Sequence, residues 1–170
     1  ILSRLTKWTG TVRRADDIPA LVTRAFTELR GGRPRPVALE LPPDVLAAST
    51  GAGTGEYAEP SPVVPSDADV ERAARLLLAA KRPLIFVGGG VLAAGASAAL
   101  TELAEVLEAP VLVSENARGA IDARHRLSFD GLALRAFRTD ADLVLGVGTR
   151  FMTTFGRQID VGRAVLVLLN

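Results

Sequence analysis

A short apolar run that ends in three glycines is the feature that most constrains the fold of this chain. Residues 84–87 are all apolar, and Gly88, Gly89 and Gly90 follow them directly, before an alanine-rich segment with helical spacing. This order predicts a strand, a loop without side chains and a helix, which is the repeating unit of a parallel α/β sheet. Ligands bind such sheets beyond the carboxyl ends of the strands, where glycines let a flat or anionic group reach the main chain. We therefore predict a ligand site at this loop; the alternative is a tight turn without a ligand.

The same alternation of helical and apolar segments surrounds the glycine loop. A helix is predicted to begin after Ser66 and Asp67, with one apolar face made of Val70, Ala73, Ala74, Leu77 and Leu78. Further helices are expected near residues 100–107 and 132–138, and further strands at 109–114, 141–148 and 164–169. Because the strands are apolar throughout, we predict an α/β fold with a doubly wound parallel sheet covered on both faces, connected by right-handed crossovers.

The amino-terminal part of the chain has a different organisation. Residues 1–10 show no regular pattern, a helix is predicted from Asp16 or Asp17 to Gly31, and residues 36–42 are predicted to form a strand. A stretch rich in Gly, Pro and Ser follows, which is typical of an interdomain linker. We therefore expect residues 1–45 to be the end of another α/β domain, 46–66 a linker, and 67–170 a central domain. Both chain ends suggest a truncated piece, since residue 1 is Ile and Asn170 directly follows an apolar run.

Composition excludes several classes of function. Twenty basic and nineteen acidic residues give a net charge of +1, without a basic stripe, so we expect no nucleic-acid binding. The absence of Cys excludes disulfides, thiolate catalysis and zinc–thiolate sites. No apolar run approaches the roughly 20 residues of a membrane span, so we expect no membrane partner and a cytoplasmic location. Only 5% of the residues are aromatic, so the core must consist mainly of Ala, Val and Leu.

Few side chains at the predicted strand ends indicate a particular chemistry. Ala93 stands where a dinucleotide-binding GxGxxG motif has its third glycine, and neither a phosphate-binding loop nor a GxSxG motif is present. The single histidine, His125, is interpreted as structural, although a Ser–His–Asp site built on it stays open. Arg150 could pair with a phosphate or could be an exposed side chain at the edge of a loop, and Arg118 has the same two readings.

Several segments together resemble the thiamine-diphosphate enzymes of the acetolactate synthase and benzoylformate decarboxylase type. The stretch containing "GGRPRPVALELPPDV", within residues 5–45, resembles the end of their pyrimidine-binding domain. "AKRPLIFVGGGV", "APVLVSENARGAID" and "ADLVLGVGTRF" resemble successive segments of their central domain, in the same order and at similar spacing. The resemblance therefore covers nearly the whole chain.

The resemblance implies a parent enzyme that acts on 2-oxoacids, either as a carboligase (a transferase) or as a decarboxylase (a lyase). In this family a GDG…NN motif of a third domain holds thiamine diphosphate and Mg²⁺, and an activating glutamate lies early in the first domain. This chain contains neither feature, so we expect both cofactors to bind outside it and the piece alone to be inactive. Its expected partners are the remaining domains of the parent and a second copy, in a homodimer or homotetramer.

The resemblance also implies a nucleotide site in the central domain, which in acetolactate synthases holds FAD. The corresponding residues here are Gly88, Gly89, Gly90, Ser114, Asn116, Gly148, Thr149 and Arg150. Two departures argue against FAD: Met152, Thr153 and Thr154 replace a charged run, and Glu115 adds a carboxylate that would repel a diphosphate. We therefore expect FAD to bind weakly or not at all, with another adenine nucleotide or an empty site as the alternatives.

Two functions from other classes remain as alternatives. A stand-alone nucleotide-binding or regulatory module would need a complete first domain, which residues 1–45 do not provide. A deacylase that consumes NAD would need a catalytic histidine motif and, as a rule, cysteines that bind zinc, and the chain has no Cys.

Overall fold

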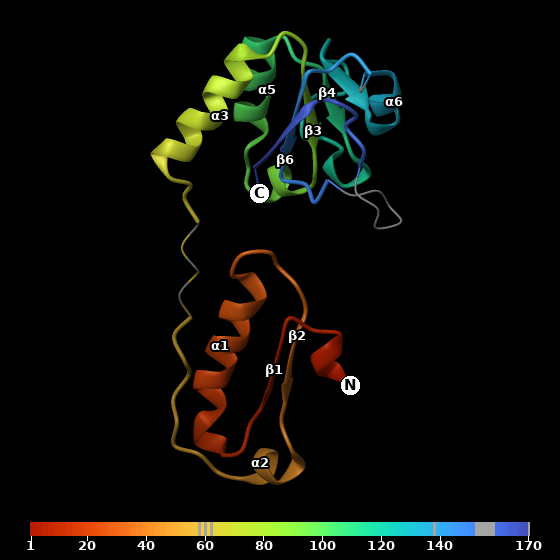
Figure 1. Ribbon diagram of the computed structural model, residues 1–170. Coiled ribbons are helices and arrows are strands. Elements are labelled where there is room, and N and C mark those ends of the chain that lie inside the picture. Colours follow the sequence, from red (N-terminus) through yellow and green to blue (C-terminus); the bar gives the residue numbers. More distant parts are fainter. Residues whose placement is uncertain (58, 60, 62, 138, 152–158, 170) are drawn as a thin grey trace. The chain divides into compact units, whose positions relative to one another are not determined.

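The computed structural model describes residues 1–57, 59, 61, 63–137, 139–151 and 159–169. The chain divides into two compact units, Ile1–Pro65 and Ser66–Asn170, which we call the first and the second unit (Figure 1). Each unit contains its own sheet.

The second unit is built on a five-stranded parallel sheet in the order β5–β4–β3–β6–β7. Its strands are β3 (Pro83–Val87), β4 (Val111–Val113), β5 (Ser128–Asp130), β6 (Leu143–Val147) and β7 (Val165–Leu169). The chain starts in the middle at β3, proceeds outward through β4 and β5, and then returns to the other side of β3 with β6 and β7. The predicted doubly wound α/β fold is therefore confirmed, and its switch point lies between β3 and β6.

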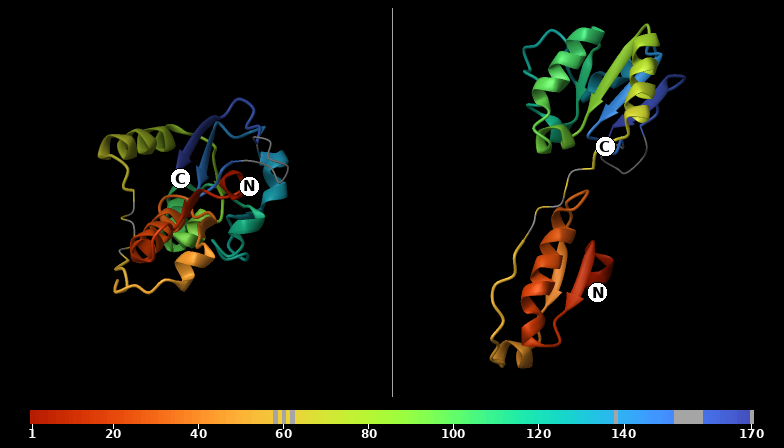
Figure 2. Two further views of the ribbon diagram at one scale, coloured as in Figure 1. Left: turned by 90° about the horizontal axis from the view of Figure 1, so that it is seen from below. Right: turned by 90° about the vertical axis from the view of Figure 1, so that its left-hand side faces the viewer.

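Alternate residues of β3 enter two different cores, one on each face of the sheet. Ile85 and Val87 pack with Leu77 of α3 (Asp67–Ala79) and with Leu100 of α5 (Ser97–Leu107). On the opposite face Leu84 and Phe86 join a cluster that includes residues of α6 (Leu134–Phe137). The two helices α3 and α5 lie on one side of the sheet and α6 on the other (Figures 1 and 2). This double burial explains why the strand residues are apolar at every position.

Several predicted details of this unit were wrong. Of the apolar face predicted for α3, only Leu77 is buried, whereas Leu78 is 77% exposed and Val70 is 52% exposed. The strand β5 was not predicted, because its three residues, Ser128–Asp130, are too short and too polar to stand out. A short helix, α4 (Gly90–Ala93), begins at the third glycine, ahead of the helix that was predicted after the loop. The predicted helix at 132–138 is divided into the 3₁₀ turn η4 (Gly131–Ala133) and α6.

The first unit has a smaller, two-layer arrangement. Strands β1 (Trp8–Thr11) and β2 (Val37–Glu40) pair in parallel, with Trp8 opposite Val37, and α1 (Ile18–Arg30) contacts both. Three short helices complete the unit: η1 (Leu2–Arg4), η2 (Ala15–Asp17) and α2 (Pro43–Ala47). The expectation of irregular structure over residues 1–10 was wrong, since β1 takes its hydrogen bonds from β2, a partner that local pattern does not reveal.

Part of the predicted linker contacts α1. The helix α2 occupies its first residues, and residues 50–57, which we call the strap, follow the length of α1 (Figure 1). Thr50 Oγ1 donates a hydrogen bond to Asp16 Oδ1 at 2.6 Å, and Thr23 Oγ1 donates to the carbonyl of Glu56 at 3.3 Å. A β-carbon on Gly55 would lie 2.8 Å from the carbonyl oxygen of Pro19, so the glycine permits this close approach.

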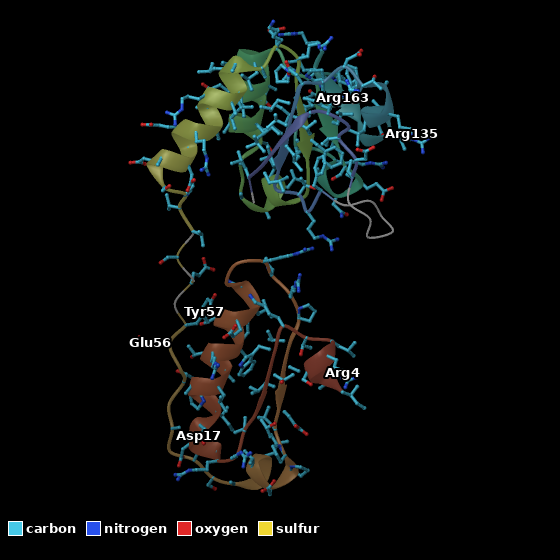
Figure 3. The ribbon with its side chains drawn as sticks, viewed as in Figure 1. Arg4, Asp17, Glu56, Tyr57, Arg135 and Arg163 are labelled. Atoms are coloured by element: carbon cyan, nitrogen blue, oxygen red, sulfur yellow. The ribbon has the colours of Figure 1, made fainter. Side chains whose placement is uncertain are left out.

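Aromatic and charged side chains fasten the carboxyl end of the strap. Tyr57 lies beside α1 (Figure 3), edge-on to Phe26 with ring centroids 5.8 Å apart. The guanidinium of Arg30 lies 5.5 Å from the centre of the Tyr57 ring and also pairs with Glu59. These contacts have no sequence period, which explains why the segment resembled a free linker.

Candidate functional site

Three neighbouring strand ends assemble the predicted site at the switch point. Because β4, β3 and β6 are adjacent and parallel, the loops that follow them meet at one edge of the sheet. Gly88–Gly90 follow β3, Ser114 and Asn116 follow β4, and Gly148–Arg150 follow β6. The structure thus brings all eight predicted residues to the same edge.

The glycines of the β3 loop allow neighbouring loops to pack against it. A β-carbon on Gly88 would lie 2.7 Å from Thr149 Cα, and one on Gly90 would lie 2.7 Å from Gly148 Cα. Gly148 itself has a φ of +57°, and its own β-carbon would lie 2.6 Å from the nitrogen of Val91. The β3 and β6 loops therefore interlock through backbone contacts, and the space that the missing side chains leave is already occupied by protein.

Two of the three main-chain donors in the glycine loop are used within the protein. Gly88 N donates to the carbonyl of Val147 at 2.9 Å, and Gly90 N donates to the carbonyl of Gly148 at 3.0 Å. Among the described residues, Gly89 N has no main-chain acceptor. An anion at this loop would therefore find one free main-chain N–H rather than a nest of three.

The β4 loop completes the edge. Ser114 N donates to the carbonyl of Val87 at 3.0 Å, which ties this loop to the end of β3. The 3₁₀ turn η3 (Glu115–Ala117) follows, and a β-carbon on Gly89 would lie 2.9 Å from the carbonyl oxygen of Asn116. The side chains of Glu115 and Asn116 are exposed at this edge. Glu115, whose carboxylate would repel a flavin diphosphate, thus lies on one of the three loops that form the candidate site.

Sequence reasoning missed the turn that places Arg150. Thr149 Oγ1 accepts a hydrogen bond from Phe151 N at 3.0 Å, while Phe151 is 1% exposed and has a φ of +52°. Arg150 itself is exposed between them. The buried aromatic in "GTRF" was the available signal, but a left-handed backbone at a phenylalanine cannot be inferred from residue type.

The other candidate residues lie elsewhere or have structural partners. His125 precedes β5, at the opposite edge of the sheet, where its Nε2 is 3.2 Å from Glu105 Oε1 and its Nδ1 accepts a hydrogen bond from Leu127 N at 3.3 Å. His125 therefore links α5 to the segment that precedes β5, away from the candidate site. Asn170 and the run Met152, Thr153 and Thr154 lie outside the described residues.

No cluster for a metal ion occurs in the described part of the chain. Nowhere among those residues do three or more His, Cys, Asp or Glu side chains come together in a group that could hold an ion. The described residues also include no helix that is long and apolar enough to cross a membrane.

The strand order and the interlocked loops define the class of domain, a doubly wound α/β domain with its candidate site at the switch point. Residues 70–165 match the family model of the thiamine pyrophosphate enzyme central domain. The chain therefore belongs to the thiamine pyrophosphate enzyme family.

Individual relatives agree with this assignment. The chain is 35% identical over 161 residues to glyoxylate carboligase from Escherichia coli O157:H7. This match covers 89% of the present chain and 27% of the relative. It is 36% identical over 158 residues to acetolactate synthase from Mycobacterium bovis. This match covers 86% of the present chain and 25% of the relative. The structure of benzoylformate decarboxylase from Polynucleobacter necessarius has the same fold, with a TM-score of 0.79 and 23% identity over 96% of this chain and 32% of that structure. The chain thus spans about a quarter of the length of these curated relatives.

Proposed function

We propose that this chain is the central region of a thiamine-diphosphate-dependent enzyme that acts on 2-oxoacids as a carboligase or decarboxylase. The observation that carries the proposal is the match of 86–89% of the chain to an acetolactate synthase and a glyoxylate carboligase at 35–36% identity. The proposed organisation assigns residues 1–45 to the end of the pyrimidine-binding domain and residues 67–170 to the central domain.

We further propose that this region is structural and does not catalyse the reaction alone. Thiamine diphosphate supplies an electron sink that stabilises the carbanion formed from a 2-oxoacid. The sequence contains no GDG…NN motif to hold its diphosphate, so both cofactor and Mg²⁺ are assigned to other parts of the enzyme. The remaining domains and a second copy of the enzyme are the proposed partners.

The switch-point edge is the proposed nucleotide site of this region. Its available groups are the Gly89 N–H, the exposed side chain of Asn116 and the guanidinium of Arg150, a donor set suited to phosphate oxygens. Glu115 on the β4 loop opposes a diphosphate in FAD and in ADP alike. We expect FAD to bind weakly, and we propose ADP, the smaller adenine nucleotide, as the alternative occupant that the three donors would hold.

Comparison of the full-length enzyme with the isolated chain tests the proposal. Both would be supplied with thiamine diphosphate, Mg²⁺ and, in separate reactions, pyruvate, glyoxylate or benzoylformate, and the release of CO₂ would be followed. We expect CO₂ release from the full-length enzyme with at least one substrate and none from the isolated chain. Failure of the full-length enzyme with every substrate would refute the assigned reaction class. Turnover by the isolated chain would show that the catalytic site had been misplaced.

A further inference from the structure

Phe151 adopts a backbone conformation that a phenylalanine rarely has, and its surroundings hold it there. Its φ of +52° lies in the left-handed region. The ring is 1% exposed and packs edge-on against Phe86, with centroids 5.2 Å apart and an interplanar angle of 78°. A β-carbon on Gly146 would lie 3.3 Å from Phe151 Cδ2, so the missing side chain in the middle of β6 leaves room for the ring.

Polar contacts fix the main chain on both sides of this ring. Thr149 Oγ1 accepts a hydrogen bond from Phe151 N at 3.0 Å, and the carbonyl of Phe151 accepts one from Ile159 N at 3.0 Å. Thr149 also packs against Gly88, since a β-carbon there would lie 2.7 Å from Thr149 Cα. The residues before and after Arg150 are therefore both anchored to the body of the domain.

Arg150 is the exposed residue between these two anchors. It lies in the loop at the carboxyl edge of β6, beside the glycine loop of β3. No ion pair between its guanidinium and another described residue is present. A guanidinium that forms no ion pair with the described residues is available to an anionic ligand.

We infer that Phe151 is a positioning residue for Arg150. It does not touch the ligand; its buried ring and left-handed backbone hold the main chain of Arg150 at the switch point, where the guanidinium can reach a diphosphate group. Such backbone strain persists only where the surroundings over-determine it, and it concentrates at functional sites. The inference rests on the nucleotide site proposed above.

Calorimetric titration of the chain with ADP and, separately, with adenosine tests the inference, because only ADP carries the phosphates that Arg150 would contact. In the wild type we expect ADP to bind about tenfold more tightly than adenosine, as one charge-assisted hydrogen bond provides. Phe151→Gly keeps the left-handed backbone accessible but removes the ring, and should abolish this preference without weakening adenosine binding. Arg150→Gln should likewise abolish the preference for ADP, and the variant that combines both substitutions should bind ADP no more weakly than either single variant.

Two further variants separate positioning from general stability. Phe151→Leu retains an apolar anchor and should keep most of the ADP preference. Leu84→Ala disturbs the same cluster near the start of β3, away from the loop, and should lower Tm without changing the preference. A folded Phe151→Gly variant that still prefers ADP as the wild type does would overturn the inference.

A measurement without a ligand separates this inference from the nucleotide proposal. If the wild type binds neither ADP nor adenosine, the nucleotide site fails, but ¹⁵N relaxation of the Arg150 backbone amide still tests the anchor. We expect that amide to be rigid in the wild type and mobile in Phe151→Gly. Equal rigidity in both would overturn the positioning role independently of any nucleotide.

Discussion

The two units of this chain use the same elements, parallel strands and helices, but they bury very different amounts of apolar surface. Among the described residues, the buried hydrophobic side chains of the first unit are Val12, Ala15, Ala25 and Val45. The second unit buries two clusters, one on each face of its five-stranded sheet. A two-stranded sheet with one helix layer is at the limit of independent stability, whereas the second unit has a core of its own.

Glycine also has two different roles in this chain. In the second unit Gly88, Gly90 and Gly148 stand where backbone meets backbone, so that a side chain at any of them would collide with a neighbouring loop. In the strap of the first unit, Gly51 and Gly53 have open space where a side chain would be. The comparison teaches that a glycine-rich stretch can indicate either tight packing or free surface, and that only its neighbours distinguish the two.

Removal of a buried leucine from the second unit should have the largest effect. Leu145→Ala, in the fully buried centre of β6, should lower the free energy of unfolding by about 2–5 kcal/mol. Val45→Ala, a smaller truncation in the small core of the first unit, removes fewer buried carbons and should cost about 1–2 kcal/mol. Denaturant unfolding followed by far-UV circular dichroism measures the first change. Fluorescence of Trp8, the single tryptophan, reports the second. Equal costs would contradict the proposed difference between the cores.

Gly→Ala substitutions should separate the packed glycines from the open ones. Gly88→Ala would place a β-carbon 2.7 Å from Thr149 Cα, and such overpacking should cost about 1–3 kcal/mol. Gly53→Ala is the control, because nothing lies within 4 Å of the added carbon, and its effect should stay within about 0.5 kcal/mol. Thermal unfolding of both variants provides the measurement. A harmless Gly88→Ala would show that the loops do not interlock as described.

Loss of the Tyr57 ring should release the strap. Tyr57→Ala removes the contacts with Phe26 and Arg30 and should cost about 0.5–1.5 kcal/mol in the first unit, with faster amide hydrogen exchange over residues 50–57. Tyr57→Phe keeps the ring, and it removes a buried hydroxyl that has no hydrogen-bond partner in the described structure. It should therefore be neutral or stabilising. If exchange in the strap is already fast in the wild type, the packed strap is refuted and the segment is a free linker.

The smallest effects should come from one carboxylate in each unit. Backbone hydrogen bonds from Lys81 N, the main cause, and Arg82 N hold the pKa of Asp142 below its ordinary 3.8. The hydroxyl of Thr50, followed by Arg14, lowers the pKa of Asp16 in the same way. A lowered folded-state pKa means that each carboxylate stabilises its unit above the ordinary pKa, and that this contribution is lost as pH falls through the folded value.

Substitution by asparagine tests these two contributions separately. Asp142→Asn should reduce the acid-induced drop in Tm of the second unit, measured by circular dichroism between neutral pH and about pH 2. Asp16→Asn should flatten the corresponding transition of Trp8 fluorescence instead. An unchanged pH profile in either variant would show that its carboxylate does not contribute in that unit.

The class of fold and the family could be predicted from the sequence because strong local signals carry them. Residues 84–87 and 143–147 are apolar runs bounded by loop signals, and such runs occur where a parallel strand is buried on both faces. The eight candidate site residues were chosen from the ends of such runs and from the resemblance, and their meeting at one edge follows from parallel pairing. Their role in binding stays a prediction.

Tertiary structure determined what depends on partners that are distant in the sequence. The strands β1 and β5 are short and partly polar, and they exist because β2 and β4 offer hydrogen bonds. The strap looked like a linker because its contacts are single side chains and one close backbone approach at Gly55, without any period. The left-handed backbone of Phe151 likewise requires the ring of Phe86 and the gap at Gly146. Local pattern identifies elements that bury their own apolar surface, but it cannot identify a conformation that only its neighbours stabilise.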